Sequence, residues 1–303
     1  MQTYEKKRFV LPIHFFKLPS PHFLLPLHSK FKTQEMDRLR FISFASGSNG
    51  NCFFVGNASQ GILIDAGIGI RTMKKRLKEI GMDFSDILGV FITHDHFDHI
   101  KSVKPLVEKM LIPIYGTKET LSSIAQLQQM GEQFQAGQRV ISKEEPVVIG
   151  DWRVTAFEVS HDGTDNVGYS VEYKDKKFTL ATDLGYVCEN SARYIAEANY
   201  LVLEANYDEE MLANGPYPYM LQERIRSNTG HLSNSDAGRF LADNYSEKLE
   251  YIYLCHLSHS NNLPELAYCT VSELLSDKGI VIGKDVELVT LERTSPSKMY
   301  VFD

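Results

Sequence analysis

Four apolar, strand-like segments of this sequence each end in a histidine or an aspartate, and this feature constrains the fold more than any other. In layered α/β folds, ligands bind beyond the carboxyl ends of the strands, because rigid strands fix the side chains while loops leave room for substrate. The sequence therefore predicts a sheet protein with its functional site at one edge. The segments are residues 89–93 before His94, 152–160 before His161, 177–182 before Asp183 and 251–255 before His256.

The rest of the chain alternates between strand and helix periodicities, which predicts an α/β fold. It opens as a β-meander followed by a helix. No repeat, low-complexity stretch or linker divides residues 39–303. The predicted strands are residues 41–45, 52–55, 61–65, 89–93, 112–115, 146–149, 152–160, 168–173, 177–182, 200–204, 251–255 and 285–291, and the predicted helices are residues 70–80, 98–110, 118–128, 191–197, 235–244 and 263–276.

The composition excludes several classes of protein. With 303 residues, 43% of them hydrophobic and 11% aromatic, the chain can bury a large core and is not globally disordered. No apolar run approaches the roughly 20 residues that span a bilayer, which excludes an integral membrane protein. The 4 cysteines form no Cys-x-x-Cys pair, so we expect neither a disulfide framework nor a thiolate zinc site, and we expect a reducing, cytoplasmic location. A net charge of −7 argues against a broadly basic nucleic-acid-binding surface but leaves local recognition open.

Residues 1–35 differ in charge from the rest of the chain. They hold six Lys or Arg and two Glu, a net +4, which leaves residues 36–303 with a net charge of −11. A basic start followed by apolar residues imitates a secretory signal, but prolines interrupt the apolar run and no small-residue cleavage site follows. Met36 opens a stretch typical of a first strand. We therefore expect residues 1–35 to be an N-terminal extension outside the fold, and residues 36–303 to form one domain.

Residues 94–99 concentrate side chains that bind metals. His94 and His96 are two apart in a near-extended segment, so they point the same way and can hold one metal. If a helix starts at about Asp98, the chain turns there and aims Asp98 and His99 at a neighbouring position. A lone histidine after a strand is more often a surface or core residue. Four ligand-type side chains within six residues, with further partners at other strand ends, instead predict a metal site.

Each of these two positions would take one more ligand from another strand end. His161 would complete three imidazoles on the first metal, and His256 would join the second. Asp183, with two carboxylate oxygens, is suited to bridge the two ions. Imidazole and carboxylate ligands without thiolate favour two divalent ions, zinc or manganese, with iron tolerated. The predicted ligands are His94, His96, Asp98, His99, His161, Asp183 and His256.

This ligand pattern resembles the metal signature of the metallo-β-lactamase superfamily. The resemblance covers the chain from about Leu39 to its end. It implies an αββα four-layer sandwich with the metals at one edge between two central sheets. Asp65 is similar to the superfamily's early strand carboxylate, which is a structural partner of the ligand loop rather than a ligand. The motif is His94-x-His96-x-Asp98-His99, followed by His161, Asp183 and His256.

Finer motifs resemble one branch of that superfamily, the YycJ family, which is also called WalJ. The resemblance implies a double-stranded DNA 5′-to-3′ exonuclease. It also matches Glu204 and His231 to a Glu and a His that assist catalysis in the related tRNA 3′-processing endonucleases, where the pair orients or protonates the leaving group. The motifs are Ser46-Gly-Ser48-Asn49-Gly-Asn51, Thr182-Asp183-Leu-Gly185, Glu204-Ala-Asn206-Tyr-Asp208, Gly215-Pro-Tyr-Pro, Gly230-His231-Leu-Ser-Asn and His256-Leu-Ser-His259-Ser-Asn261-Asn262.

Two of these motifs can also be interpreted from their residues alone. Glu204 ends an apolar strand and needs a partner if it is buried, and His231 is the partner we predict. His231 could instead cap the helix that starts near Ser235. The turn at residues 46–51 offers hydroxyls and backbone N–H groups that suit a phosphate, although an ordinary glycine-rich hairpin has the same composition. The predicted phosphate-binding residues are Ser46, Ser48, Asn49, Asn51 and His259.

These features predict a hydrolase, a metal-dependent phosphodiesterase that acts on DNA. Two metal ions can supply the nucleophile at neutral pH, neutralise a phosphate and stabilise the leaving oxygen. Asp183 would bridge the metals, and His231, supported by Glu204, would protonate the departing oxygen. The same ligands would serve a hydrolase of RNA or of a small molecule such as a thioester, a lactone or a cyclic phosphodiester, so these alternatives stay open. The complete ligand set disfavours a non-catalytic DNA-binding subunit.

Overall fold

The structure is a computed structural model that describes residues 37–302. The chain divides into a unit of Met1–Asp37 and a unit of Arg38–Asp303. The expected N-terminal extension, residues 1–35, lies outside the described residues. Within residues 37–302, no helix is long and apolar enough to cross a lipid bilayer.

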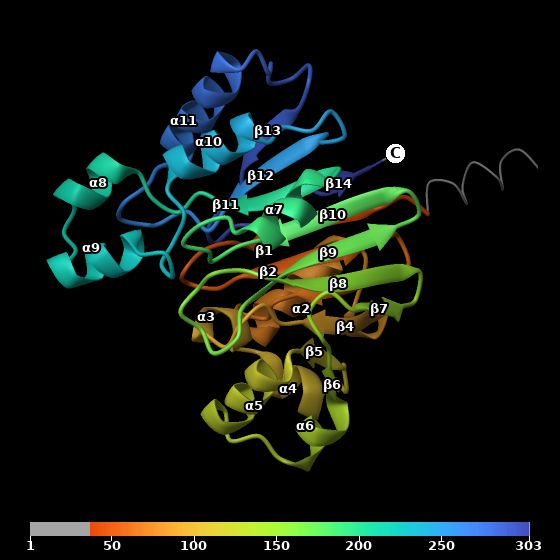
Figure 1. Cartoon of the computed structure of the whole chain (residues 1–303). Coiled ribbons are helices and arrows are strands. Elements are labelled where there is room, and N and C mark those ends of the chain that lie inside the picture. The colour runs from red at the N-terminus through yellow and green to blue at the C-terminus, as the bar shows by residue number, and fades with distance from the viewer. Residues whose placement is uncertain (1–36, 303) are drawn as a thin grey trace, which may run out of the picture. The chain divides into compact units, whose positions relative to one another are not determined.

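The described part of the second unit contains two seven-stranded sheets. The first sheet comprises β1 (Arg40–Ala45), β2 (Cys52–Gly56), β3 (Gly61–Ile64), β4 (Ile87–Phe91), β5 (Ile114–Gly116), β6 (Gln138–Val140) and β14 (Tyr300–Val301). The second comprises β7 (Pro146–Ile149), β8 (Trp152–Glu158), β9 (Val167–Tyr173), β10 (Lys176–Ala181), β11 (Tyr200–Glu204), β12 (Tyr251–Cys255) and β13 (Glu287–Thr290). Their strand orders are β14-β1-β2-β3-β4-β5-β6 and β13-β12-β11-β10-β9-β8-β7 (Figure 1).

Helices connect the strands, and most of them lie on the outer faces of the sheets (Figure 1). Those of the first half are α2 (Ile70–Glu79), the 3-10 helix η2 (Phe84–Asp86), α3 (Phe97–Ile100), α4 (Val103–Glu108), α5 (Lys118–Leu127) and α6 (Glu132–Gly137). Those of the second half are α7 (Glu189–Ala196), α8 (Glu209–Asn214), α9 (Tyr219–Arg226), α10 (Asn234–Asp243) and α11 (Pro264–Asp277).

Three apolar clusters hold these layers together. One lies between the sheets and includes Phe41 and Phe91 of the first sheet with Tyr169 and Phe178 of the second. A second cluster packs the outer face of the first sheet against helices α2 to α6. The third packs the outer face of the second sheet against α7, α10 and α11. Burial of apolar surface on both faces of each sheet is the driving force of such a layered fold. The αββα four-layer sandwich predicted from the sequence is therefore confirmed.

The structure corrects one predicted helix. Residues 98–110 were expected to form a single helix, but α3 ends at Ile100 and α4 begins at Val103. The backbone N–H of Ser102 donates to the Ala66 carbonyl at 2.8 Å instead of continuing the helix, and Pro105 has no N–H to donate to a preceding turn. The short helix α3, which carries Asp98 and His99, is therefore separate from α4, which packs on the first sheet.

The strand directions bring the predicted site residues to one edge. β10, β11 and β12 pair in parallel. β8 runs in the same direction as β10, because both pair antiparallel with β9. The carboxyl ends of these strands therefore meet at the same edge of the second sheet. They are followed along the chain by His161, Asp183 and His256, while Glu204 is the last residue of β11.

Candidate metal centre

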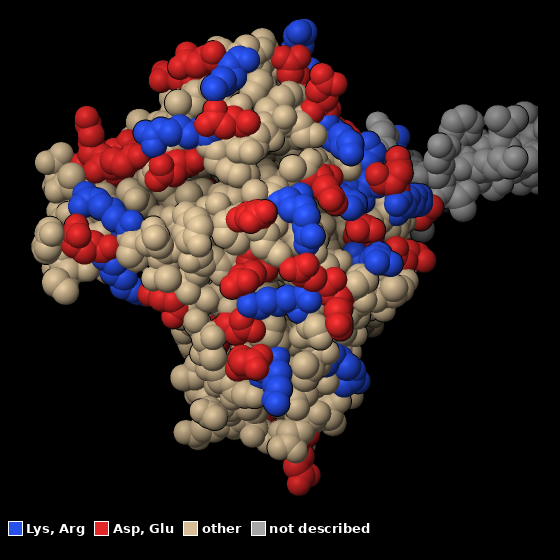
Figure 2. Space-filling view, viewed as in Figure 1, with Lys and Arg blue, Asp and Glu red and all other residues tan. Residues whose placement is uncertain are grey.

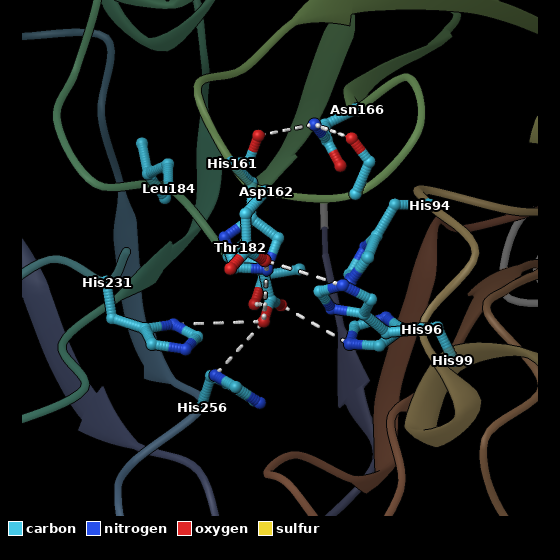
Figure 3. Close-up of polar contacts among 12 residues, drawn as sticks. His94, His96, His99, His161, Asp162, Asn166, Thr182, Leu184, His231 and His256 are labelled. Atoms are coloured by element: carbon cyan, nitrogen blue, oxygen red, sulfur yellow. Dashed lines mark hydrogen bonds and ion pairs between the residues drawn. The ribbon is translucent and has the colours of Figure 1, made fainter. Parts of the chain in front are cut away.

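The loop after β4 supplies four of the predicted ligands. Thr93 and His94 follow the strand in extended chain, and His96 is the residue immediately before α3. Asp98 and His99 lie within the single turn of α3. The chain therefore turns where the sequence predicted, so that the two halves of the motif face different positions. Figure 3 shows the imidazoles of His94, His96 and His99 on one side of the centre, facing His231 and His256 on the other.

The first group of candidate ligands contains only imidazoles. One ligand atom each of His94, His96 and His161 lie within 4.8 Å of one another. The Nε2 atoms of His94 and His161 are buried and have no hydrogen-bond partner among the described residues. Unpartnered buried polar atoms are costly in a folded protein. Their convergence fits a bound cation that would satisfy them.

The second group mixes carboxylate and imidazole. Ligand atoms of Asp98, His99 and His256 also lie within 4.8 Å of one another, and the buried Nε2 of His256 has no hydrogen-bond partner within residues 37–302. Asp183 lies between the two groups. Its Oδ2 is 3.4 Å from His99 Nε2, while its Oδ1 is 3.4 Å from His256 Nδ1 and 3.9 Å from His161 Nε2. This placement fits the predicted bridging role.

Buried polar side chains orient the ligands of the β4 loop. The fully buried Asp65 carboxylate lies 2.8 Å from His99 Nδ1 and accepts a hydrogen bond of 2.9 Å from the backbone N–H of Thr93. The Thr93 hydroxyl is 3.0 Å from His94 Nδ1. Asn51 is also fully buried, and its Nδ2 lies 2.9 Å from His99 Nε2. Such partners fix the tautomer and the ring orientation of metal-binding histidines. Asp65 therefore acts as the structural partner that the sequence predicted.

The remaining histidines are fixed by the second half of the chain. His161 Nδ1 lies 2.9 Å from the Gly230 carbonyl, to which it can donate. The Asn206 amide donates to the His256 carbonyl at 2.8 Å, and the Ser46 hydroxyl accepts from the His256 N–H at 2.9 Å. Loops from both sheets therefore hold the ligands.

Three residues at this edge have a left-handed backbone conformation. Asp65, Asp183 and His256 have φ angles of 62°, 53° and 55°. Residues other than glycine rarely adopt this left-handed region, which costs about 1–3 kcal/mol per residue. Each of the three residues comes within two positions of the end of a strand. The turn redirects the carboxylate or the imidazole toward the centre, so the surrounding packing must maintain the strain.

Carboxylates and imidazoles shift one another's pKa in the centre. Burial opposes charge on His99, but the carboxylates of Asp65, Asp183 and Asp98 raise its pKa well above the ordinary value. Burial also opposes charge on His256, yet the carboxylates of Asp183, Asp98 and Glu204 raise its pKa to about 10. The carboxylates therefore attract positive charge strongly. A divalent cation would supply that charge without protonating the ligands.

In the first group of candidate ligands, the pKa values of two histidines are lowered rather than raised. Burial lowers the pKa of His94 well below the ordinary value, and burial also lowers the pKa of His161. These two imidazoles are therefore neutral at pH 7, which is the form that binds a metal.

Glu204 and His231 form a pair beside the ligands, as the sequence predicted. Glu204 is fully buried, and its Oε1 lies 2.7 Å from His231 Nδ1 and 3.0 Å from His256 Nδ1. Its Oε2 accepts from the backbone N–H groups of Leu184 at 2.8 Å and Leu232 at 3.3 Å. Burial would raise the pKa of Glu204, but His231 and His256 hold it well below its usual range. Ligand atoms of Asp183, Glu204, His231 and His256 also lie within 4.8 Å of one another. Because both oxygens of Glu204 already accept hydrogen bonds, we assign this residue as a partner of His231 rather than as a metal ligand.

Comparison with known proteins gives the family of this chain. A family model described as "Beta-lactamase superfamily domain" matches residues 60–256. The chain is 35% identical over 261 residues to exodeoxyribonuclease YycJ of Bacillus anthracis, a match that covers 86% of this chain and 98% of the relative. The chain belongs to the YycJ/WalJ family of the beta-lactamase superfamily. Exodeoxyribonuclease WalJ of Streptococcus pneumoniae R6 is 32% identical over 249 residues, covering 82% of this chain and 93% of the relative.

Solved structures show the same fold at lower identity. The metallo-beta-lactamase fold protein YhfI from Bacillus subtilis superposes with a TM-score of 0.63 at 16% identity, covering 87% of this chain and 100% of YhfI. PqqB from Methylobacterium extorquens, in its Zn²⁺-bound form, gives a TM-score of 0.62 at 15% identity, covering 86% of this chain and 99% of PqqB. The fold inferred from the resemblance to the metallo-β-lactamase superfamily is thereby confirmed.

The turn that carries the predicted phosphate contacts divides into buried and exposed residues. Ser46 and Asn51 are fully buried and contact His256 and His99, so in this YycJ/WalJ-family chain they hold ligand residues in place. Ser48, Asn49 and His259 are exposed. Contact with a phosphate stays a prediction, and the geometry favours the exposed residues for it.

Sequence reasoning missed one contact between the centre and α9. Asp162, which directly follows His161, is not among the site residues predicted from the sequence. Its Oδ1 lies 3.4 Å from His96 Nε2 and 3.5 Å from His161 Nε2, and its Oδ2 accepts from Arg224 Nε at 2.6 Å. The position of Asp162 directly after a ligand was a signal, but its partner Arg224 is 62 residues away and no local pattern indicates it.

Proposed function

We propose that this chain is a metal-dependent phosphodiesterase that cleaves DNA, acting as a 5′-to-3′ exonuclease on double-stranded DNA in the cytoplasm. The observation that carries the proposal is the placement of the Glu204–His231 pair beside two groups of ligand atoms that share Asp183. The exodeoxyribonuclease names of the YycJ and WalJ relatives support DNA as the substrate. The 5′-to-3′ direction rests on the family resemblance alone.

Two divalent ions would occupy the centre. His94, His96 and His161 would hold one ion, and Asp98, His99 and His256 the other, with Asp183 contacting both. Zinc or manganese fits this donor set, with iron as a further candidate. When bound, such ions lower the pKa of water toward about 7 and neutralise charge on a phosphate.

The chain's own residues would complete the chemistry. Because His231 Nδ1 is engaged by Glu204, its Nε2 is the nitrogen that can carry a proton to the departing oxygen. The Glu204 carboxylate, 2.7 Å from His231 Nδ1, fixes the orientation of this imidazole. Ser48 and Asn49, on the exposed part of the first turn, would contact the phosphate that follows the scissile bond.

The direct test is cleavage of a linear duplex that carries distinct labels at each 5′ and 3′ end, in Mn²⁺ or Zn²⁺. Wild-type protein should release mononucleotides from the 5′ ends, and Asp98→Ala should not, because it removes a ligand of the second ion. Asp208→Ala is the matched control, since Asp208 caps α8 through the Met211 N–H and is not a predicted ligand. The same loss in both variants would contradict the assignment of Asp98.

The outcome also separates the alternatives. Release of mononucleotides from the 3′ ends would support DNA as the substrate but would show that the direction of cleavage is 3′-to-5′. The duplex could stay intact while a chromogenic phosphodiester is still hydrolysed in a metal-dependent manner. This result would support the metal centre and would indicate that the substrate is RNA or a small molecule. Hydrolysis of no phosphodiester at all would overturn the proposed function.

A further inference from the structure

Three of the most exposed aromatic side chains lie on segments that carry or join residues of the candidate centre. Within residues 37–302, the aromatic side chains most exposed to solvent are those of Phe97, Tyr186, Tyr219 and Tyr268. Phe97 lies between two predicted ligands, and Tyr186 is three residues after Asp183. Tyr219 lies on the segment between Glu204 and His231. Large exposed apolar groups next to a functional site commonly mark a binding surface.

Phe97 is the most direct of these observations. It is the first residue of α3, between His96 and Asp98, and it remains 67% exposed. The next two residues of the same turn are held, because Asp98 accepts a hydrogen bond from Asn51 and His99 contacts Asp65. The backbone on both sides of Phe97 is therefore fixed while its ring faces solvent. A rigid aromatic ring loses little conformational entropy when it binds a ligand.

Tyr219 reaches the same edge from the second half of the chain. It begins α9 and is 69% exposed, next to Met220 at 78%. The Arg224–Asp162 ion pair, 2.6 Å between Nε and Oδ2, ties this helix to the loop that carries His161. The backbone N–H of His231 also donates to the Ile225 carbonyl at 2.9 Å. Figure 1 shows α9 and α3 at the same side of the described unit.

We propose that Phe97 and Tyr219 stack on unpaired nucleobases of the strand that is being cleaved. This inference rests on the proposed function and adds a specificity to it. A base inside a duplex has both faces covered by its neighbours, so stacking of two rings on bases of one strand requires a frayed or single-stranded end. The enzyme would therefore act on a strand end whose first nucleotides are unpaired, and it would tolerate any sequence because every base has an aromatic face.

The charge distribution favours base stacking over binding that depends on ionic contacts alone. On the face in Figure 2, acidic and basic side chains are interspersed rather than gathered into one basic patch. Residues 36–303 carry a net charge of −11, so long-range attraction to the DNA backbone is weak. Arg224 and Arg226 lie on α9 itself, but Arg224 pairs with Asp162 and Arg226 pairs with Glu223, so their charges are already partly neutralised.

The test compares two duplexes with a four-nucleotide 5′ extension. In one the extension is thymidine, and in the other it is the abasic tetrahydrofuran analogue, which keeps the phosphates and removes the bases. For the wild type, kcat/KM should be higher on the thymidine extension. In Phe97→Ala and in Tyr219→Ala the ratio of the two kcat/KM values should fall by about tenfold, mainly through KM. Phe97→Trp should keep the ratio, because it keeps a ring.

Tyr268→Ala is the matched control, since it removes an exposed aromatic side chain of α11 outside the ligand loops. Its ratio should equal that of the wild type. A second readout uses 2-aminopurine in the extension, whose fluorescence should fall on binding to the wild type and less on binding to Phe97→Ala. An unchanged ratio and unchanged fluorescence in both alanine variants would overturn the stacking inference while leaving the nuclease standing. A wild type that cleaves neither duplex would instead overturn the proposed function.

Discussion

Several histidines of the candidate centre are held through Nδ1, which directs Nε2 toward the ligand groups; the Nε2 of His99 also lies 2.9 Å from Asn51 Nδ2. The Nδ1 atoms of His99, His161 and His256 contact Asp65, the Gly230 carbonyl and Glu204, respectively. A histidine whose Nδ1 is fixed in this way presents Nε2 to a metal without a loss of rotamer freedom on binding. Glu204 contacts the Nδ1 atoms of both His256 and His231, so this contact alone does not separate them; His231 differs in lying outside the His94–His96–His161 and Asp98–His99–His256 groups.

At this scale we predict that His231→Ala separates turnover from metal binding. Loss of a general acid should reduce kcat by about 10²- to 10⁴-fold. Metal content, measured by mass spectrometry of the dialysed protein, should stay at the wild-type value. His94→Ala is the comparison and should lose both metal and activity. Loss of metal in His231→Ala as well would mean that His231 is a ligand and not an acid.

At the scale of the element, α9 and the loop that follows it connect substrate-facing residues to the ligands. Gly230 lies where the chain leaves α9, and its carbonyl orients His161. A Cβ at this position would come within 2.2 Å of the Arg224 and Ile225 carbonyl oxygens. Only glycine allows this close approach of two backbone segments. The packing of α9 and the orientation of His161 therefore depend on the same residue.

We predict that Gly230→Ala disrupts both the stability and the metal content of the protein. Overpacking against backbone typically costs about 1–3 kcal/mol, which corresponds to a fall in Tm of about 2–5 °C for a domain of this size. Gly69→Ala is the matched control, because a Cβ there meets nothing within 4 Å. Differential scanning calorimetry and metal analysis of both variants would check the prediction. Equal behaviour of the two variants would contradict it.

At the scale of the whole molecule, bound ions would connect the two sheets. The ligands come from the loop after β4 in the first sheet and from the ends of β8, β10 and β12 in the second. Ions that bind only the folded chain add their binding free energy to its stability. The buried carboxylates in the centre also favour a cation there, because like charges that are buried together destabilise the fold.

We predict that removal of metal with a chelator lowers Tm by about 10 °C, since each ion at 100 times its Kd contributes about 2.7 kcal/mol. Zinc or manganese added back should restore the transition. His94→Ala, which lacks a ligand of the first ion, should show a smaller shift with the chelator. The same Tm with and without chelator in the wild type would show that no ion stabilises the fold.

The N-terminal extension gives a second prediction at this scale. A chain that starts at Met36 should keep its nuclease activity and should unfold within about 2 °C of the full chain, because it retains every element of the two sheets. Calorimetry and the end-labelled duplex assay on both proteins would test this. A drop of about 5 °C or more would show that residues 1–35 contribute to the fold.

The sequence by itself determined the strand ends, the ligand types and the layered fold. These features are local, since an apolar run that ends in His161 or Asp183 is visible without any long-range contact. The resemblance of the ligand motif to the superfamily then gave the αββα arrangement, and the sheets confirm it. The pairing of Glu204 with His231 could be predicted because a carboxylate at the end of a buried strand requires a partner.

Only the tertiary structure decided which side chains hold the ligands in place. Ser46 and Asn51 were predicted as phosphate contacts from their turn, yet they are buried against His256 and His99, which are 210 and 48 residues away. The short strands β6 and β14, and the helices α8 and α9, were not predicted. They are too short for a clear periodicity and are defined by hydrogen bonds and packing with distant segments. Local patterns specify which groups can bind a metal, whereas the meeting of distant loops specifies how those groups are oriented and what surrounds them.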